Sequence, residues 1–177
     1  MAINYYDVGL PDSIMSKVRY SPMEDVALAI LRRAFPDVLV LSLIPDDQPP
    51  SPEGGGDADY FILTRRAYQW GEWGGDKRGF MDSGGIEIHV YTKDPDGDLK
   101  GALISEAVRS AFEQAAKEKW RIDDTTTVHA VQMIIEPIRK ADWATSQGPV
   151  QYADLPQGSW RYITTYQVKT RRQTRNA

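Results

Sequence analysis

The chain has 177 residues and no cysteine, and its 21 Lys and Arg against 25 Asp and Glu give a net charge of −4. Its length suits one globular domain, and its 41% hydrophobic and 26% charged residues are ordinary for such a domain. This composition excludes disulfides, thiolate metal sites and cysteine nucleophiles, and the acidic balance argues against nucleic acid or an anionic membrane as the main partner.

The sequence lacks the marks of export and of membrane insertion. Residues 1–10 contain no basic cluster followed by an apolar core, which is the pattern of a secretory signal. No apolar run approaches the ~20 residues that a membrane-spanning helix needs. We therefore expect a soluble protein that is made in the cytosol and has no membrane partner.

The first helix is predicted to begin after Ser21-Pro22 and to end at Pro36. Serine can cap a helix, proline at the first helical position costs nothing, and Glu24 can reach back to the Ser21 amide. Apolar residues then recur at helical spacing: Val26, Ala27, Ile30, Leu31, Ala34 and Phe35. The apolar run 38–44 that follows is too short for a helix and predicts a strand buried on both faces.

Two more strands are predicted in the middle of the chain, over residues 60–68 and 86–91. A glycine-rich link at 69–85 joins them in the manner of a hairpin. A long loop at 45–59 precedes them, with four prolines, three consecutive glycines, five acidic residues and no basic residue.

A long second helix is predicted after the acidic turn 94–98. Asp98 can cap it, and the helix runs to about Trp120, which corresponds to roughly 30–35 Å. The residues expected to form its apolar stripe are Leu103, Ala107, Ala111, Phe112 and Ala115.

Two strands close the chain. Residues 125–138 are rich in β-branched side chains, and a second long loop at 139–157 follows. Residues 160–169 then alternate, which predicts a strand with one packed face and one wet face. The packed face is expected to consist of Trp160, Tyr162, Thr164, Tyr166 and Val168, and the wet face of Arg161, Thr165, Gln167 and Lys169, with Ile163 among them.

These elements follow the order α-β-β-β-α-β-β, without an internal repeat. The expected fold is a single α+β domain over residues 1–177, in which a mostly antiparallel or mixed sheet of about five strands carries two packed helices. Its ordered core is expected at about 21–172, followed by a short basic tail at 173–177.

Candidate catalytic and metal-binding motifs do not withstand inspection. A calcium loop beginning at the acidic turn would need a glycine at position six and a glutamate at position twelve, where this chain has Leu99 and Ser105. His89 and His129 are the two histidines, and we see no carboxylate at ligand spacing from either. We therefore expect no catalytic residue, no metal and no cofactor, and we expect that the protein is not an enzyme.

Two patterns favour contact with another protein. Large aromatic residues fall in the predicted loops, where they pack within the chain or against a partner. They are Trp70, Trp73, Phe80, Trp143 and Tyr152, with Lys77 and Arg78 between them in sequence. The acidic loop with Asp46 and Asp47 is opposite in charge to the C-terminal Arg171 and Arg172, so these are either two solvated runs or a contact between neighbouring subunits.

The order and lengths of these elements resemble the tail terminator proteins of long-tailed bacteriophages. The resemblance covers most of residues 21–172. It rests on the first helix with its end at 31–38, on residues 60–66, on the alternating run 86–91 before the alanine-rich helix, and on the closing run 160–168.

This resemblance implies a structural virion protein, assembled in the host cytoplasm, that forms a homohexameric ring on the head-proximal end of the tail tube. Such a ring ends polymerisation of the tail tube protein and presents a surface to the head–tail connector proteins, while genome DNA passes through its lumen without sequence-specific binding. The ring requires a heterologous interface whose rotation closes. The residues that we expect at the subunit or tail interface are Trp70, Trp73, Lys77, Arg78, Phe80, Trp143, Tyr152, Arg171, Arg172, Asp46 and Asp47.

Three other functions stay open at this point. Another head–tail connector or neck component would also assemble into a closed ring. A small metal-dependent enzyme built on the acidic loops 45–59 and 92–98 is disfavoured, because no nucleophile, base and orienting group can be named together. A nucleic-acid-binding module using Arg65, Arg66 and the basic C-terminal end is disfavoured by the overall acidity.

Overall fold

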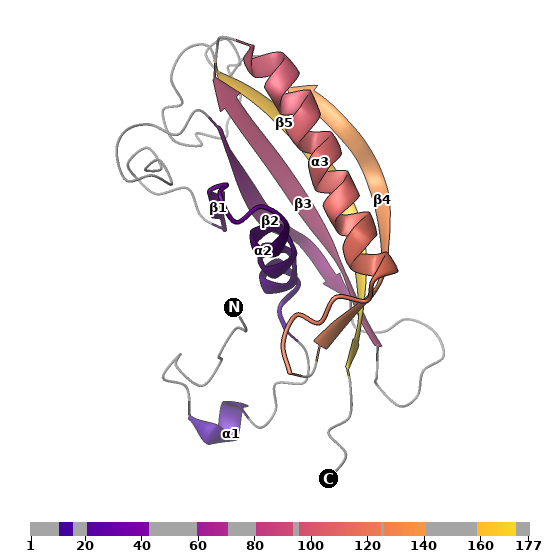
Figure 1. Cartoon of the computed structure of the whole chain (residues 1–177). Coiled ribbons are helices and arrows are strands. Elements are labelled where there is room, and N and C mark those ends of the chain that lie inside the picture. Colours follow the sequence, from indigo (N-terminus) through magenta and orange to yellow (C-terminus); the bar gives the residue numbers. More distant parts are fainter. Residues whose placement is uncertain are drawn as a thin grey trace.

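The computed structural model describes residues 11–15, 21–42, 60–70, 81–93, 96–124, 126–140 and 159–172. In this part of the chain, one five-stranded sheet carries two long helices on the same face (Figure 1). The predicted α+β class and the order of the long elements are therefore confirmed. A short helix, α1 (Asp12–Met15), precedes them.

The sheet is mixed and mainly antiparallel, with the strand order β1-β2-β3-β5-β4. β1 (Val40–Leu41) pairs in parallel with β2 (Tyr60–Trp70). The other pairs are antiparallel: β2 with β3 (Met81–Lys93), β3 with β5 (Ser159–Arg172), and β5 with β4 (Thr126–Lys140). Within the described residues, β1 and β4 are therefore the two edge strands.

All five strands differ from their predicted bounds, and β2 and β5 extend two and three residues further, to Trp70 and Arg172. β3 begins at Met81, five residues before the predicted start, because both its neighbours pair with Ser83, Gly84 and Gly85 despite their poor strand propensity. β4 continues into the predicted loop as far as Lys140. β1 has two paired residues, and burial on both faces was a wrong expectation because β1 is an edge, where Val40 is buried but Leu41 is half-buried.

Helix α2 (Met23–Ala34) agrees with its predicted span, but its predicted cap is wrong. No side chain caps the helix; the Ser21 hydroxyl instead hydrogen-bonds to the Asp123 carboxylate and lies 2.9 Å from the Thr126 hydroxyl. Ser21 is buried, so its hydroxyl ties the chain before α2 to the beginning of β4 rather than to the helix backbone.

Helix α3 (Gly97–Lys117) presents small residues to the sheet over its first half. Its buried residues are Gly97, Gly101, Ser105, Val108, Ala111, Phe112 and Ala115. Leu103 was expected in this stripe but is 61% exposed. The reason is a close approach: a Cβ on Gly101 would lie 2.6 Å from the Tyr162 ring, so no larger residue fits between the helix and β5 there.

The core lies between the two helices and the sheet face that they cover. Ile62, Ile86 and Ile88 are almost fully buried on that face. Phe112 of α3 stacks on Tyr166 of β5, with ring centroids 4.6 Å apart and planes at 7°. The predicted packed face of β5 is thus confirmed at Thr164, Tyr166 and Val168, whereas Trp160 and Tyr162 are half-buried.

The predicted wet face of β5 is only partly correct. Lys169 is exposed, but Thr165 is 6% exposed. Thr165 lies in register between Glu87 of β3 and Ile135 of β4, on the sheet face away from the helices. Side chains from both neighbouring strands therefore cover this threonine, which the sequence of β5 alone does not indicate.

Candidate interaction surface

The predicted interface residues fall into two groups. Eight of the eleven lie outside the described residues: Asp46, Asp47, Trp73, Lys77, Arg78, Phe80, Trp143 and Tyr152. The other three lie on strands. Trp70 ends β2 opposite Ser83, and Arg171 stands in register between Met81 of β3 and Thr127 of β4.

These three residues gather at one end of the sheet. Arg172 pairs with Thr126, next to the Arg171–Thr127 pair, and the Trp70–Ser83 row lies two positions further along β3. Trp70 was expected in the glycine-rich link, which is wrong because β2 extends through it. The Arg171 side chain is exposed, as an interface residue of a single subunit would be.

The opposite end of the molecule carries an apolar surface that the sequence analysis missed. Seven large hydrophobic residues are exposed in the described part of the chain, and five of them lie on the second half of β4 or the first two turns of α3. We call these five the β4 edge patch: Ile134, Ile135, Ile138, Leu99 and Leu103, which are 43–62% exposed. Leu99 and Leu103 are four residues apart, a spacing that places both on one face of a helix. The exposure of that face depends on the close approach of Gly101 to Tyr162, which the spacing does not reveal.

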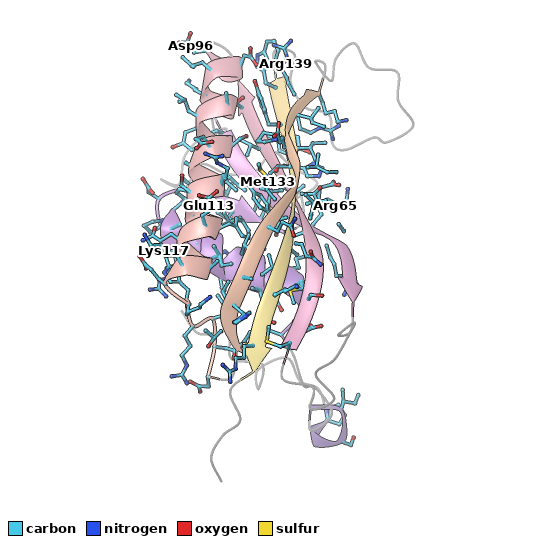
Figure 2. The ribbon with its side chains drawn as sticks, turned by 90° about the vertical axis from the view of Figure 1, so that its right-hand side faces the viewer. Arg65, Asp96, Glu113, Lys117, Met133 and Arg139 are labelled. Carbon is cyan, nitrogen blue, oxygen red and sulfur yellow. The ribbon has the colours of Figure 1, made fainter. Side chains whose placement is uncertain are left out.

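The β4 edge patch straddles the edge of the sheet. Ile135 is in register with Thr165, and Ile138 with Ile163, so both lie on the face away from the helices. Leu99 and Leu103 stand one turn apart on the outer surface of α3. In the view along this edge, β4 is in front, with α3 on one side and Arg65 on the other (Figure 2).

The backbone of β4 is irregular beneath the patch. Its register with β5 shifts between Met133 and Ile135 and again between Ile135 and Ile138. Pro137 lies in the second interval and has no N–H to donate. Bulges and proline on an edge strand prevent indiscriminate strand pairing. This edge is therefore suited to contacts made by side chains rather than to a continuous backbone ladder.

A polar network fixes the same end of the molecule. The Asp98 carboxylate accepts hydrogen bonds from the Tyr162 hydroxyl and, at 3.0 Å, from Arg139 Nη1. The guanidinium of Arg139 lies 5.3 Å from the ring centroid of Trp160. The Tyr162 hydrogen bond, together with Arg139, holds the pKa of Asp98 below its ordinary value. Asp98 was expected to cap α3, but it instead joins the beginning of α3 to β4 and β5.

Ionisable residues occupy the sheet face away from the helices. Arg65 pairs in register with Glu87, and Tyr91 with Arg161. Between them, His89 is 2% exposed, and its Nε2 contacts Glu87 Oε1. Burial lowers the pKa of His89, although the Glu87 carboxylate opposes that effect.

The contact between His89 and Glu87 corrects the sequence analysis. We saw no carboxylate at ligand spacing from His89. Glu87 is two residues away on the same strand, however, and residues two apart on a strand share a face, so the sequence did indicate this contact. A single histidine–glutamate contact is not a metal site. The described residues contain no group of three or more histidines, cysteines and acids that could hold a metal ion.

The comparisons with known proteins give a weak structural match. No family model and no curated protein matches the sequence. One solved structure, which carries no descriptive name, superposes on 89% of this chain and 100% of its own with 10% identity and a TM-score of 0.46. A likeness at that level carries no argument about function. Among the described helices, none is long and apolar enough to cross a membrane.

Proposed function

We propose that this chain is a structural subunit of a bacteriophage tail, which forms a closed ring on the head-proximal end of the tail tube as tail terminator proteins do. The proposal rests on the resemblance in order and length of elements, and it agrees with the α+β fold. It assigns the protein to the virion, with further copies of itself, the tail tube protein and the head–tail connector proteins as partners.

The observation that supports assembly most directly is the β4 edge patch. Five large hydrophobic side chains are exposed on β4 and the adjacent beginning of α3, and the Asp98–Tyr162 and Asp98–Arg139 contacts join the elements that carry them. Clustered apolar exposure of this kind is typical of a surface that another protein covers. A rigid apolar surface also costs less conformational entropy when a partner binds. This is the property that a ring subunit needs.

The alternative that shares this observation is another ring-forming connector or neck protein. The two proteins differ in what the ring binds, because a terminator must bind the tail tube and stop its growth. The metal-dependent enzyme is not favoured by any group of residues in the described segments.

The first test is the native mass of the purified protein over a concentration series, with the same samples viewed by negative-stain electron microscopy. We expect closed rings of six subunits, formed by the protein alone or after addition of tail tube protein. Adding preformed rings to polymerising tube protein should shorten the tubes. A monomer that forms no ring and leaves tube length unchanged would contradict the proposal, and rings without an effect on tubes would favour the connector.

The strand end that carries Trp70, Arg171 and Arg172 is our candidate for tube contact. Arg171→Glu combined with Arg172→Glu should leave ring formation intact and weaken tube capping by about tenfold or more, since arginines often dominate protein interfaces. Lys117→Glu combined with Lys119→Glu is a matched double charge reversal at the C-terminal end of α3, where both side chains are exposed. Equal capping by both variants would remove this strand end from the interface.

A further inference from the structure

The two edges of the sheet are level with each other. One line of register partners runs from Ile138 on β4 through Ile163, His89 and Leu63 to Leu41 on β1. The outer half of β4 and the whole of β1 therefore lie at the same height on opposite edges. Because β1 is parallel to β2, and each later neighbour in the sheet is antiparallel, β4 runs antiparallel to β1.

From this geometry we propose that β4 of one subunit contacts β1 of the next copy of this chain, and that this contact closes the ring. The inference rests on the proposed function, because it names the surface through which the ring subunits meet. Two copies standing side by side, the same way up, bring the second half of β4 beside β1 in antiparallel orientation.

The apolar residues match in this arrangement. Ile135 and Ile138 lie on the sheet face away from the helices. On β1, Leu41 and the preceding Leu39 lie on the same face, where they pack against Leu63 and Tyr91 and stay half-buried. The neighbour's Leu39 and Leu41 would therefore continue the apolar row that the isoleucines begin.

The charges on the helix side also match. Arg32 of α2 is exposed, and its Nη2 donates to the Val40 carbonyl at 3.1 Å. The Leu39 carbonyl accepts from the Ile62 amide of β2, so the Val40 carbonyl, one residue on, points away from β2. Arg32 thus lies at the outer edge of the sheet. α3 carries the exposed acids Glu106 and Glu113, which flank and pair with Arg109 of the same helix. This cluster keeps one net negative charge, which the Arg32 of a neighbour would meet.

The contact is heterologous, because β4 and β1 are different surfaces. Each added copy leaves the same two edges exposed, so assembly continues until rotation closes it. Closure requires that every contact turn successive copies by the same angle about the axis of the ring. Bulges and Pro137 on β4 are compatible with this contact, since side chains rather than a backbone ladder make it.

Cysteine cross-linking tests the contact directly, because the natural chain has no cysteine. Ile138→Cys combined with Leu41→Cys should give, after mild oxidation, a ladder of covalent oligomers that ends at the ring size. Each single variant should give no ladder. A dimer formed efficiently by Ile138→Cys alone would show that β4 meets β4, and it would overturn the proposal.

A charge swap tests the helix side. Arg32→Glu should weaken ring formation by about tenfold, which corresponds to ~1.4 kcal/mol. Adding Glu106→Lys and Glu113→Lys should restore part of that loss. Lys117→Glu, on the last turn of α3 and outside the β4 edge patch, is the matched control. Equal loss in the control, or no restoration, would overturn the charge match.

Hydrogen exchange tests the same contact on the protein of natural sequence, so the result does not depend on whether the variants fold. Residues 134–140 and 38–42 should both exchange at least tenfold more slowly in the ring than in dilute monomer. Rings in which either segment stays unprotected would overturn this inference while the proposed function stands. Cross-linked open chains that never close would support the contact and contradict the proposed ring.

Discussion

The two faces of the same three central strands are built on different principles. Towards the helices, β2, β3 and β5 present Ile62, Ile88 and Tyr166, which are buried in the apolar core. Away from the helices, the alternate positions present Arg65, His89 and other ionisable residues. The first face is held by close packing and the second by cross-strand polar pairs, so the two should respond to different perturbations.

The largest effect is expected from a truncation on the helix-covered face. Phe112 is fully buried and stacks on Tyr166. Phe112→Ala should lower the free energy of unfolding by about 3–5 kcal/mol, through lost apolar burial and the cavity left behind. Ile138→Ala, on the other face and 47% exposed, should cost under about 1 kcal/mol. Urea denaturation of the dilute monomer measures both, and similar losses would mean that the two faces do not differ in this way.

A second test adds volume to the covered face instead of removing it. Gly101→Ala should stabilise an isolated helix by about 1 kcal/mol. Here the new methyl group would lie 2.6 Å from the Tyr162 ring, which cannot move without loosening its hydrogen bond to Asp98. We expect a net loss of about 1–2 kcal/mol.

The double-variant cycle identifies the cause of that loss. In a Tyr162→Ala background the obstruction is gone, so Gly101→Ala should become neutral or stabilising. If the loss persists there, another contact of Gly101 is responsible.

Ser21 offers an intermediate effect at the margin of the covered face. Ser21→Ala removes a hydroxyl that hydrogen-bonds to Asp123 and Thr126, and it should cost about 1–2 kcal/mol. Ser21→Asp distinguishes the hydrogen bonds to Asp123 and Thr126 from a helix-capping role of residue 21. An aspartate is as good a cap as serine, but its charge would repel Asp123. A larger loss of unfolding free energy for aspartate than for alanine supports the hydrogen bonds to Asp123 and Thr126, and the reverse order would support the cap predicted from sequence.

The fold was predictable because its signals are local. Helical spacing in α2, alternation in β5 and the prolines at 22 and 36 depend on residues close together in sequence. The extension of β3 to Met81 was not predictable from the residues 83–85 themselves. It depends on pairing with β2 on one side and β5 on the other, which are distant in sequence.

The candidate surface was less predictable than the fold. Exposure of Leu103 follows from the fit of Gly101 against Tyr162, a contact between residues 61 positions apart. Exposure of Ile135 and Ile138 follows from the place of β4 at the edge of the sheet. The alternation of apolar and polar residues along one strand does not reveal which place in the sheet that strand takes. The aromatic residues chosen from sequence, apart from Trp70, lie outside the described residues, so their role stays a prediction.

The smallest effect, and the one specific to the face away from the helices, is a dependence of stability on pH through His89. Burial lowers the pKa of His89 below the ordinary 6.5, with Arg161 and Arg65 acting in the same direction and Glu87 against it. The unfolded chain then binds the proton more readily than the folded protein. The stabilising contribution of neutral His89 is therefore complete above about pH 6.5 and is lost as the pH falls towards the lowered pKa, by at most ~1.4 kcal/mol per pH unit.

His89→Gln should remove this slope from the free energy of unfolding measured in urea between about pH 5 and 7.5. His129→Gln is the matched control, because His129 is exposed on β4. Phe112→Ala should lower the whole curve without changing its slope, since no titrating group is lost. An unchanged slope in His89→Gln would mean that the ionisable face does not respond to protons through its one buried histidine.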